Sequence, residues 1–121
     1  MRLREIKREM IKIDFSRRGG SISLKMQGHA GYSRGGADIV CAAVSGIFYA
    51  LLGFLANEES GLEVGAIASG DVEIECAEEY ESAMKQAYIG FLQIAMTYPG
   101  TAQVSESVWG ARVGAPIRAA V

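Results

Sequence analysis

Hydrophobic and polar residues alternate in two segments near the start of the chain. Hydrophobic residues occupy every second position from Ile11 to Phe15 and again from Ile22 to Met26. Alternation of this kind is typical of a strand with one buried face. A Ser-Arg-Arg-Gly-Gly run between the two segments favours a turn. The pattern therefore predicts a hairpin over residues 10–27.

Two later segments carry hydrophobic residues at the three-to-four-residue spacing of a helix. The first is predicted over 39–57, with Asp38 as its N-cap. The second is predicted from 77 or 78 to 98, where a Pro-Gly pair ends it. Alternation returns in three more predicted strands: 62–66, 72–76 and 102–106.

The resulting order, ββαββαβ, belongs to the α+β class, with a mixed or antiparallel sheet and two helices packed on it. A chain of 121 residues most often forms one domain and buries about two-thirds of its unfolded surface. We expect this domain to span 10–107. Residues 1–9 would be a basic N-terminal extension and residues 108–121 a C-terminal tail.

Composition narrows the class of protein. Half of the residues are hydrophobic, which argues against disorder. Two cysteines are too few for a disulfide scaffold, and the charged first ten residues do not resemble a signal peptide. The uncharged stretch Ile39–Ala56 is nearly long enough to span a bilayer, but its Ala and Gly content and its lack of a basic flank favour a buried helix. We expect a cytoplasmic protein that binds no membrane.

Charge is distributed unevenly along the chain. Residues 1–35 hold nine of the twelve Lys and Arg residues but only three of the fourteen acidic residues. A basic segment can bind an anionic partner such as nucleic acid. Solvated strand faces and a basic leader explain the same charges, and sequence charge alone predicts binding weakly. We therefore expect no direct nucleic-acid binding.

The candidate chemistry centres on His29 and Cys41. His29 is the only histidine, and Cys41 follows it by twelve residues at the start of the first predicted helix. Free N–H groups and the helix dipole in a first turn favour a thiolate, and an imidazole could activate it as a nucleophile. By itself, a free cysteine is more often a small buried residue, and His29 could equally be an ordinary loop residue. Cys76 alternates with hydrophobic residues and is expected in the core.

Neighbouring residues could support such a site. Asp38 is expected to cap the helix and could instead orient the imidazole. Ser45, one turn after Cys41, could donate a hydrogen bond near the sulfur or simply allow close packing. Four glycines would permit tight turns and close approach to a peptide, or form an ordinary surface loop: Gly28, Gly31, Gly35 and Gly36.

Other chemistries lack the residues they need. The chain has no CxxC or HExxH motif, and one histidine with two distant cysteines cannot build a usual zinc site. Neither a Walker A pattern nor a Rossmann glycine pattern is present. We expect no metal and no cofactor.

The two motifs around the candidate pair are GHAGY at 28–32, which includes Tyr32, and DIVCAAVS at 38–45, with Gly36 between them. Together they resemble the signature of the ribosomal-processing cysteine protease family, Prp, over about Met10 to Glu106. The resemblance implies a small cytoplasmic homodimer that removes a short N-terminal extension from a large-subunit ribosomal protein. It implies Cys41 as nucleophile and His29 as base, with Asp38 and Ser45 at motif positions and the glycine-rich loop, including Tyr32, over the bound peptide.

Three alternatives remain open at this point. Family members near phage genes could process capsid or scaffold proteins, and the extra residues at both ends leave room for a prophage-type relative. A dimeric binding module could keep the fold without turnover. Cys41 could also be a redox-sensing thiol, although no resolving cysteine lies near it in the sequence.

Overall fold

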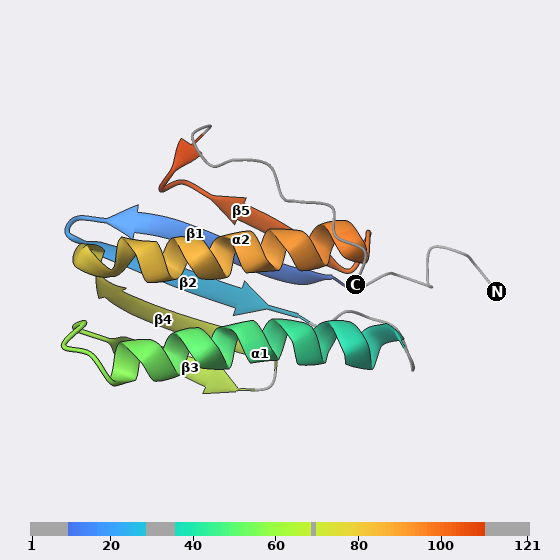
Figure 1. Cartoon of the computed structure of the whole chain (residues 1–121), viewed down its shortest axis with the longest axis horizontal. Helices are drawn as coiled ribbons and strands as arrows, with labels where there is room; N and C mark the ends of the chain where they lie inside the picture. Colours follow the sequence, from blue (N-terminus) through green and yellow to red (C-terminus); the bar gives the residue numbers. More distant parts are fainter. Residues whose placement is uncertain (1–9, 29–35, 69, 111–121) are drawn as a thin grey trace.

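The computed structural model describes residues 10–28, 36–68 and 70–110. Within them the elements follow the predicted order ββαββαβ (Figure 1). The strands are β1 (Ile11–Arg18), β2 (Ser21–Gln27), β3 (Glu63–Ala68), β4 (Asp71–Ala77) and β5 (Ala102–Glu106). The helices are α1 (Gly36–Ala56) and α2 (Glu81–Thr97), and the short 3-10 turn η2 (Glu78–Tyr80) precedes α2.

The five strands form one mixed sheet in the order β3-β4-β2-β1-β5. β1 and β2 form the predicted antiparallel hairpin, whereas β5 pairs with β1 in the parallel sense. β4 pairs antiparallel with both β2 and β3. The sheet is therefore mixed and the fold is α+β, as the sequence pattern predicted.

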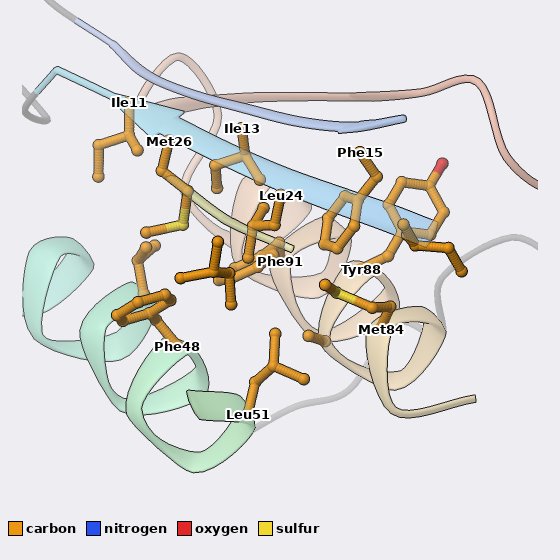
Figure 2. Close-up of a cluster of buried hydrophobic side chains, with 14 of the residues drawn as sticks. Ile11, Ile13, Phe15, Leu24, Met26, Phe48, Leu51, Met84, Tyr88 and Phe91 are labelled. Carbon is orange, nitrogen blue, oxygen red and sulfur yellow. The ribbon is translucent and has the colours of Figure 1, made fainter. Parts of the chain in front are cut away.

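Both helices pack against the same face of the sheet, and the core fills the space between the two layers (Figures 1 and 2). Every second residue of the strands points into this core, for example Ile13 and Phe15 in β1 and Leu24 in β2. The alternation read from the sequence is thus the alternation between the helix-covered face and the open face of the sheet. The helices contribute residues at helical spacing: Val40, Val44, Phe48, Leu51 and Leu55 from α1, and Met84, Ala87, Tyr88 and Phe91 from α2.

The first helix begins earlier than the sequence pattern predicted. α1 starts at Gly36, so Asp38 lies inside its first turn instead of preceding it, and the predicted N-cap position of Asp38 is wrong. Gly36, expected in the loop, is the first helical residue. Cys41 is the sixth residue of α1 and therefore lies in its second turn, one turn further from the N-terminus than expected. An acidic residue in a first turn still interacts favourably with the helix dipole, so the sequence is compatible with the longer helix.

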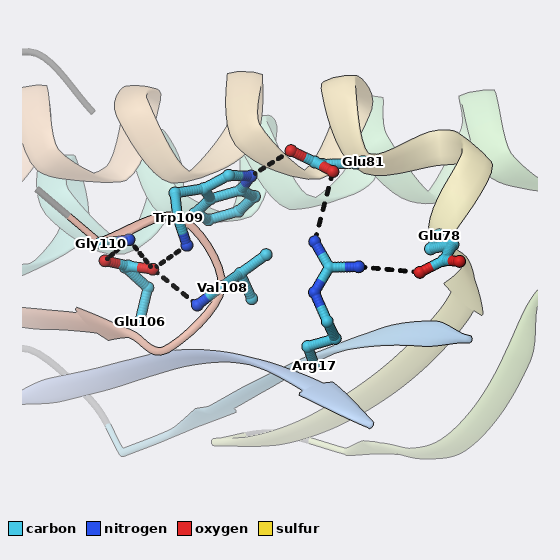
Figure 3. A network of polar contacts seen from close by, with 7 residues as sticks. All are labelled: Arg17, Glu78, Glu81, Glu106, Val108, Trp109 and Gly110. Carbon is cyan, nitrogen blue, oxygen red and sulfur yellow. Dashed lines mark hydrogen bonds and ion pairs between the residues drawn. The ribbon is translucent and has the colours of Figure 1, made fainter. Parts of the chain in front are cut away.

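The sheet and the two helices form a two-layer sandwich. A compact turn after β5 closes the end of this sandwich that lies opposite to the start of α1 (Figure 3). The Glu106 carboxylate accepts hydrogen bonds from the backbone N–H groups of Val108, Trp109 and Gly110 at 2.7, 2.6 and 3.0 Å. The Trp109 ring is buried and stacks on Tyr88 with 5.1 Å between ring centroids. Trp109 belongs to the segment expected as a tail, and it forms part of the core.

Candidate active site

A cavity of about 490 Å³ lies at the end of the sandwich where α1 begins. Four parts of the chain form its wall: the start of β1, the end of β2, the first half of α1 and the β3–β4 turn. These parts are distant in sequence and meet because β2 lies between β1 and β4 in the sheet. A cavity of this size holds several peptide side chains or one small ligand.

Cys41 and Ser45 both line this cavity. They are four residues apart on α1, so both side chains lie on the helix face that borders the cavity. The Cys41 side chain is half-buried, Ser45 is exposed, and the thiol is not in a disulfide. A half-buried thiol on a cavity wall can both receive a substrate and be approached by a base.

Gly28 fixes the point where the chain leaves β2 toward His29. Its φ of +93° lies in the left-handed region, and a Cβ atom there would come within 2.5 Å of the Met10 carbonyl oxygen. Its N–H donates a hydrogen bond of 2.9 Å to the Gly70 carbonyl oxygen in the β3–β4 turn. Only glycine adopts this φ angle and allows so close an approach of the carbonyl oxygen without strain. The structure therefore brings Gly28 to the same cavity as Cys41.

The structure describes only part of the remaining predicted site residues. His29, Gly31, Tyr32 and Gly35 lie outside the described residues. The backbone of Asp38 lies in the first turn of α1, three residues before Cys41. The pairing of His29 with Cys41 therefore stays a prediction from the sequence.

Sequence reasoning missed several residues of the cavity wall. Tyr49, which is 62% exposed, follows Ser45 by one further helical turn, so the spacing along α1 could have identified it. Ile67 and Asp71 also line the cavity, but they reach it through the pairing of β4 with β2. Gln27 and Asp71 are partners in that pairing. No local signal in the sequence reveals a contact of this kind.

The second cysteine occupies a different environment. Cys76 is 1% exposed and sits on β4 among core residues, as the alternation predicted. Burial, and to a lesser extent the neighbouring Glu75 carboxylate, raises the pKa of the Cys76 thiol to about 11. This thiol is therefore protonated at neutral pH and closed off from solvent, whereas Cys41 borders the cavity. Among the described residues, no group of three His, Cys, Asp or Glu side chains could hold a metal ion.

A second, larger groove of about 810 Å³ lies between α1 and α2 on the outer side of the helical layer. Its wall is mostly hydrophobic and carries neither cysteine.

The segment Ile39–Ala56 of α1 has the length and hydropathy of a membrane span, and 28% of it is buried. Its inner residues, including Val40 and Leu55, are fully buried against the sheet.

A half-buried thiol on the wall of a cavity meets one requirement of a cysteine-dependent hydrolase, and the base of such an enzyme lies outside the described residues. Comparison with known proteins identifies the class further. The sequence profile of the family described as "Cysteine protease Prp" matches residues 10–103. The chain therefore belongs to the cysteine protease Prp family and is a cysteine-type peptidase.

Solved structures show that the fold is shared with known proteins. An essential ribosomal processing protease Prp from S. aureus, in complex with a covalently linked product peptide, has a TM-score of 0.69 and 19% sequence identity, with 81% of this chain and all of that chain covered. The same protease with a substrate peptide gives a TM-score of 0.68 at 18% identity and the same coverage. SMU.848 from Streptococcus mutans gives 0.63 at 25% identity, with 80% of this chain and 93% of that chain covered. No curated protein sequence matches the chain.

Proposed function

We propose that this peptidase removes a short N-terminal extension from a large-subunit ribosomal protein. The observation that carries the proposal is the position of Cys41, half-buried on the wall of a cavity that can take a peptide. The family assignment and the similar fold of a ribosomal processing protease that binds a substrate peptide support the same substrate class.

We assign Cys41 as the nucleophile and His29 as the general base. His29 takes the proton from the Cys41 sulfur, and the sulfur attacks the carbonyl carbon of the scissile bond. Backbone N–H groups of the first turn of α1, which have no partner within the helix, stabilise the oxyanion. His29 returns the proton to the leaving amine as the C–N bond breaks, and a thioester remains. Water then attacks the thioester, the C–S bond breaks, and the thiol regains its proton.

The remaining motif residues have supporting roles in this proposal. Asp38, in the first turn of α1, orients the imidazole. Ser45 lies on the same wall as Cys41 and donates a hydrogen bond near the sulfur or to the peptide. Gly31, Tyr32 and Gly35 belong to the loop that covers the bound peptide. The site needs no metal and no cofactor for this chemistry.

We further propose that the protein is a cytoplasmic homodimer. Both cysteines are free thiols, which suits a reducing compartment. The outer side of α1 carries no charged residue from Ile39 to Ala56, and a helix that is hydrophobic on its outer side as well usually contacts a partner. Sedimentation velocity over a range of protein concentrations tests the dimer: a species of twice the chain mass is expected, and a monomer at all concentrations would contradict it.

Mass spectrometry of peptide cleavage tests the function. The probe is a synthetic peptide that contains the N-terminal extension of the host's large-subunit ribosomal protein and the residues that follow it. Wild type should cut it once, Cys41→Ala should not cut it, and His29→Ala should cut it about 10²–10⁴-fold more slowly. Near wild-type cleavage by His29→Ala would overturn the assignment of the base. A wild type that leaves this peptide intact but cuts phage capsid or scaffold peptides would overturn the ribosomal substrate and keep the peptidase.

A further inference from the structure

The sheet ends in two edge strands, and β3 is the edge next to α1 (Figure 1). β3 pairs with β4 on one side, and no described strand pairs with its other side. An unpaired edge presents a row of backbone N–H and C=O groups that can accept another extended chain.

The composition of β3 leaves this edge open. Natural edge strands are usually protected by charged residues, especially lysine, or by proline. β3 reads Glu-Val-Gly-Ala-Ile-Ala, with one charge at its start and no lysine or proline. The other edge strand, β5, exposes polar side chains, and one of them, Ser105, donates a hydrogen bond of 2.7 Å to Asp14 on the neighbouring strand.

A bulge places two hydrophobic side chains of β3 on the same face. Val64 and Ile67 are three residues apart, so a regular strand would point them to opposite faces. The register shift between Val64 and Ala66 sets Val64 opposite Ile74 and Ile67 opposite Val72. Ile74 is fully buried beneath the helices and Val72 lines the cavity, so both β3 side chains lie on the helix-covered face. They are nevertheless 50% and 48% exposed, because β3 is at the edge.

This edge is continuous with the active-site cavity. Ile67, near the C-terminal end of β3, lines the cavity together with Cys41 and Tyr49. A chain that paired with the free side of β3 would therefore be led along the strand toward the thiol. The six residues of β3 extend about 20 Å at the rise of a strand, which is long enough to pair with a segment of similar length.

We propose that the substrate binds as an extended strand added to the free edge of β3, with hydrophobic side chains at alternate positions over Val64 and Ile67. Main-chain hydrogen bonds to β3 then supply affinity and register, and the two hydrophobic contacts supply selectivity. The pairing holds the scissile bond beside Cys41. This inference rests on the proposed peptidase function and adds to it the way in which the substrate is recognised.

A backbone N-methyl scan of the cleaved peptide tests the pairing. Each variant of the synthetic peptide carries one N-methyl group, which removes a single hydrogen-bond donor. Strand addition uses every second N–H of the added chain. N-methylation at alternate positions should therefore lower kcat/KM about tenfold or more, and at the positions between them it should change kcat/KM much less. The same alternation should appear in the affinity of the peptides for Cys41→Ala, measured by fluorescence anisotropy. A scan without alternation would overturn the proposal.

Two substitutions test the hydrophobic contacts. Ile67→Ser should raise KM about three- to tenfold because the contact with the substrate is lost. Tyr98→Ser is the control: Tyr98 is 36% exposed at the end of α2, and it lines neither the cavity nor the groove between α1 and α2. Sedimentation velocity should confirm that both variants keep the oligomeric state of the wild type. Equal KM values for Ile67→Ser and wild type would overturn the proposal, and cleavage by wild type would in that case leave the peptidase function standing.

Discussion

The two ends of the sandwich are built in opposite ways. At one end, the first half of α1 lies beside the ends of β2 and β3, and the cavity opens there next to Cys41. At the other end, the Trp109 indole N–H donates to Glu81 at 2.9 Å, and Arg17 bridges Glu81 and Glu78 (Figure 3). The first end has a half-buried thiol on a cavity wall, whereas the second is filled by stacked aromatic rings and a hydrogen-bonded turn.

We expect the cavity end to determine activity and the Trp109 end to determine stability. β1 reaches both ends, with Ile11 at the cavity and Arg17 in the polar network. Packing at the Trp109 end can therefore hold the sheet while the cavity end stays open for a substrate. The free energy of local unfolding commonly differs between regions of a protein, and binding regions are often among the least stable. Substitutions at the two ends should thus have opposite consequences.

The largest effect on activity is expected from Cys41→Ala. This change removes the proposed nucleophile, so peptide cleavage should fall to the background level. The side chain is only half-buried, so the free energy of unfolding should change by about 1 kcal/mol or less. Urea unfolding and mass spectrometry of the cleaved peptide measure the two quantities. A strongly destabilised Cys41→Ala protein would show that the cavity end also carries stability.

The largest effect on stability is expected from Trp109→Ala. Loss of this buried ring and of its contacts with Phe15 and Tyr88 should cost about 3–5 kcal/mol. Trp109→Phe is the matched control, since it keeps a ring but loses the hydrogen bond to Glu81, and it should cost about 1 kcal/mol beyond any change in packing. The folded fraction of either variant should retain wild-type kcat/KM. A fall in kcat/KM for fully folded Trp109→Phe would show that the two ends are coupled.

Gly28→Ala should reduce activity more than stability. The added methyl would meet the Met10 carbonyl oxygen at 2.5 Å with φ at +93°, so the backbone must shift where it leads to His29. A displacement of about 1 Å in a catalytic group can cost about 10²-fold in rate, and we expect kcat/KM to fall about 10- to 100-fold. Gly20→Ala is the control, because a Cβ there meets nothing within 4 Å. Equal kcat/KM for both variants would remove the role of Gly28 in positioning.

The two thiols should differ in their reaction with iodoacetamide at pH 7. Cys41 borders the cavity, whereas Cys76 is buried with its thiol pKa raised to about 11. The folded protein should take up one label, at Cys41, and unfolding in urea should expose the second site. Peptide mapping after timed alkylation measures both rates. Labelling of Cys76 as fast as that of Cys41 would indicate that the core opens readily.

The smallest effect is expected at Glu106. Burial alone would raise the pKa of this carboxyl, but hydrogen bonds from the N–H groups of Trp109, Val108 and Gly110 leave the pKa below its ordinary value. A carboxyl whose pKa is lowered by folding stabilises the folded state above its unfolded pKa, and this contribution is lost as pH falls through the folded pKa. Glu106→Gln should therefore unfold more easily than wild type at pH 7. The difference in urea midpoint should shrink below about pH 4, and a difference that is constant with pH would contradict this account.

Local patterns predicted most of the secondary structure. Alternation at Ile11, Ile13 and Phe15 and helical spacing at Met84 and Phe91 each correspond to residues that are buried in the structure. The start of α1 was predicted three residues late, because Asp38 is equally favourable as an N-cap and in the first turn. Phe48 is buried deeply in α1 and did not stand out in the pattern, since the helix is hydrophobic on most of its surface.

The sequence alone determined the order of the elements, the core positions of β1, β2 and β4 and the two motifs that led to a cysteine peptidase. It could do so because turn residues and hydrophobic periodicity act over a few neighbouring residues. The bulge in β3 shifts its side chains, so its predicted alternation does not hold along the whole strand. Only the tertiary structure decided the strand order, and with it the cavity that joins Cys41 to Gly28 and Ile67. The same packing decided that Trp109 belongs to the core and that β3 is an open edge. These features depend on contacts between residues far apart in the chain, which no local pattern records.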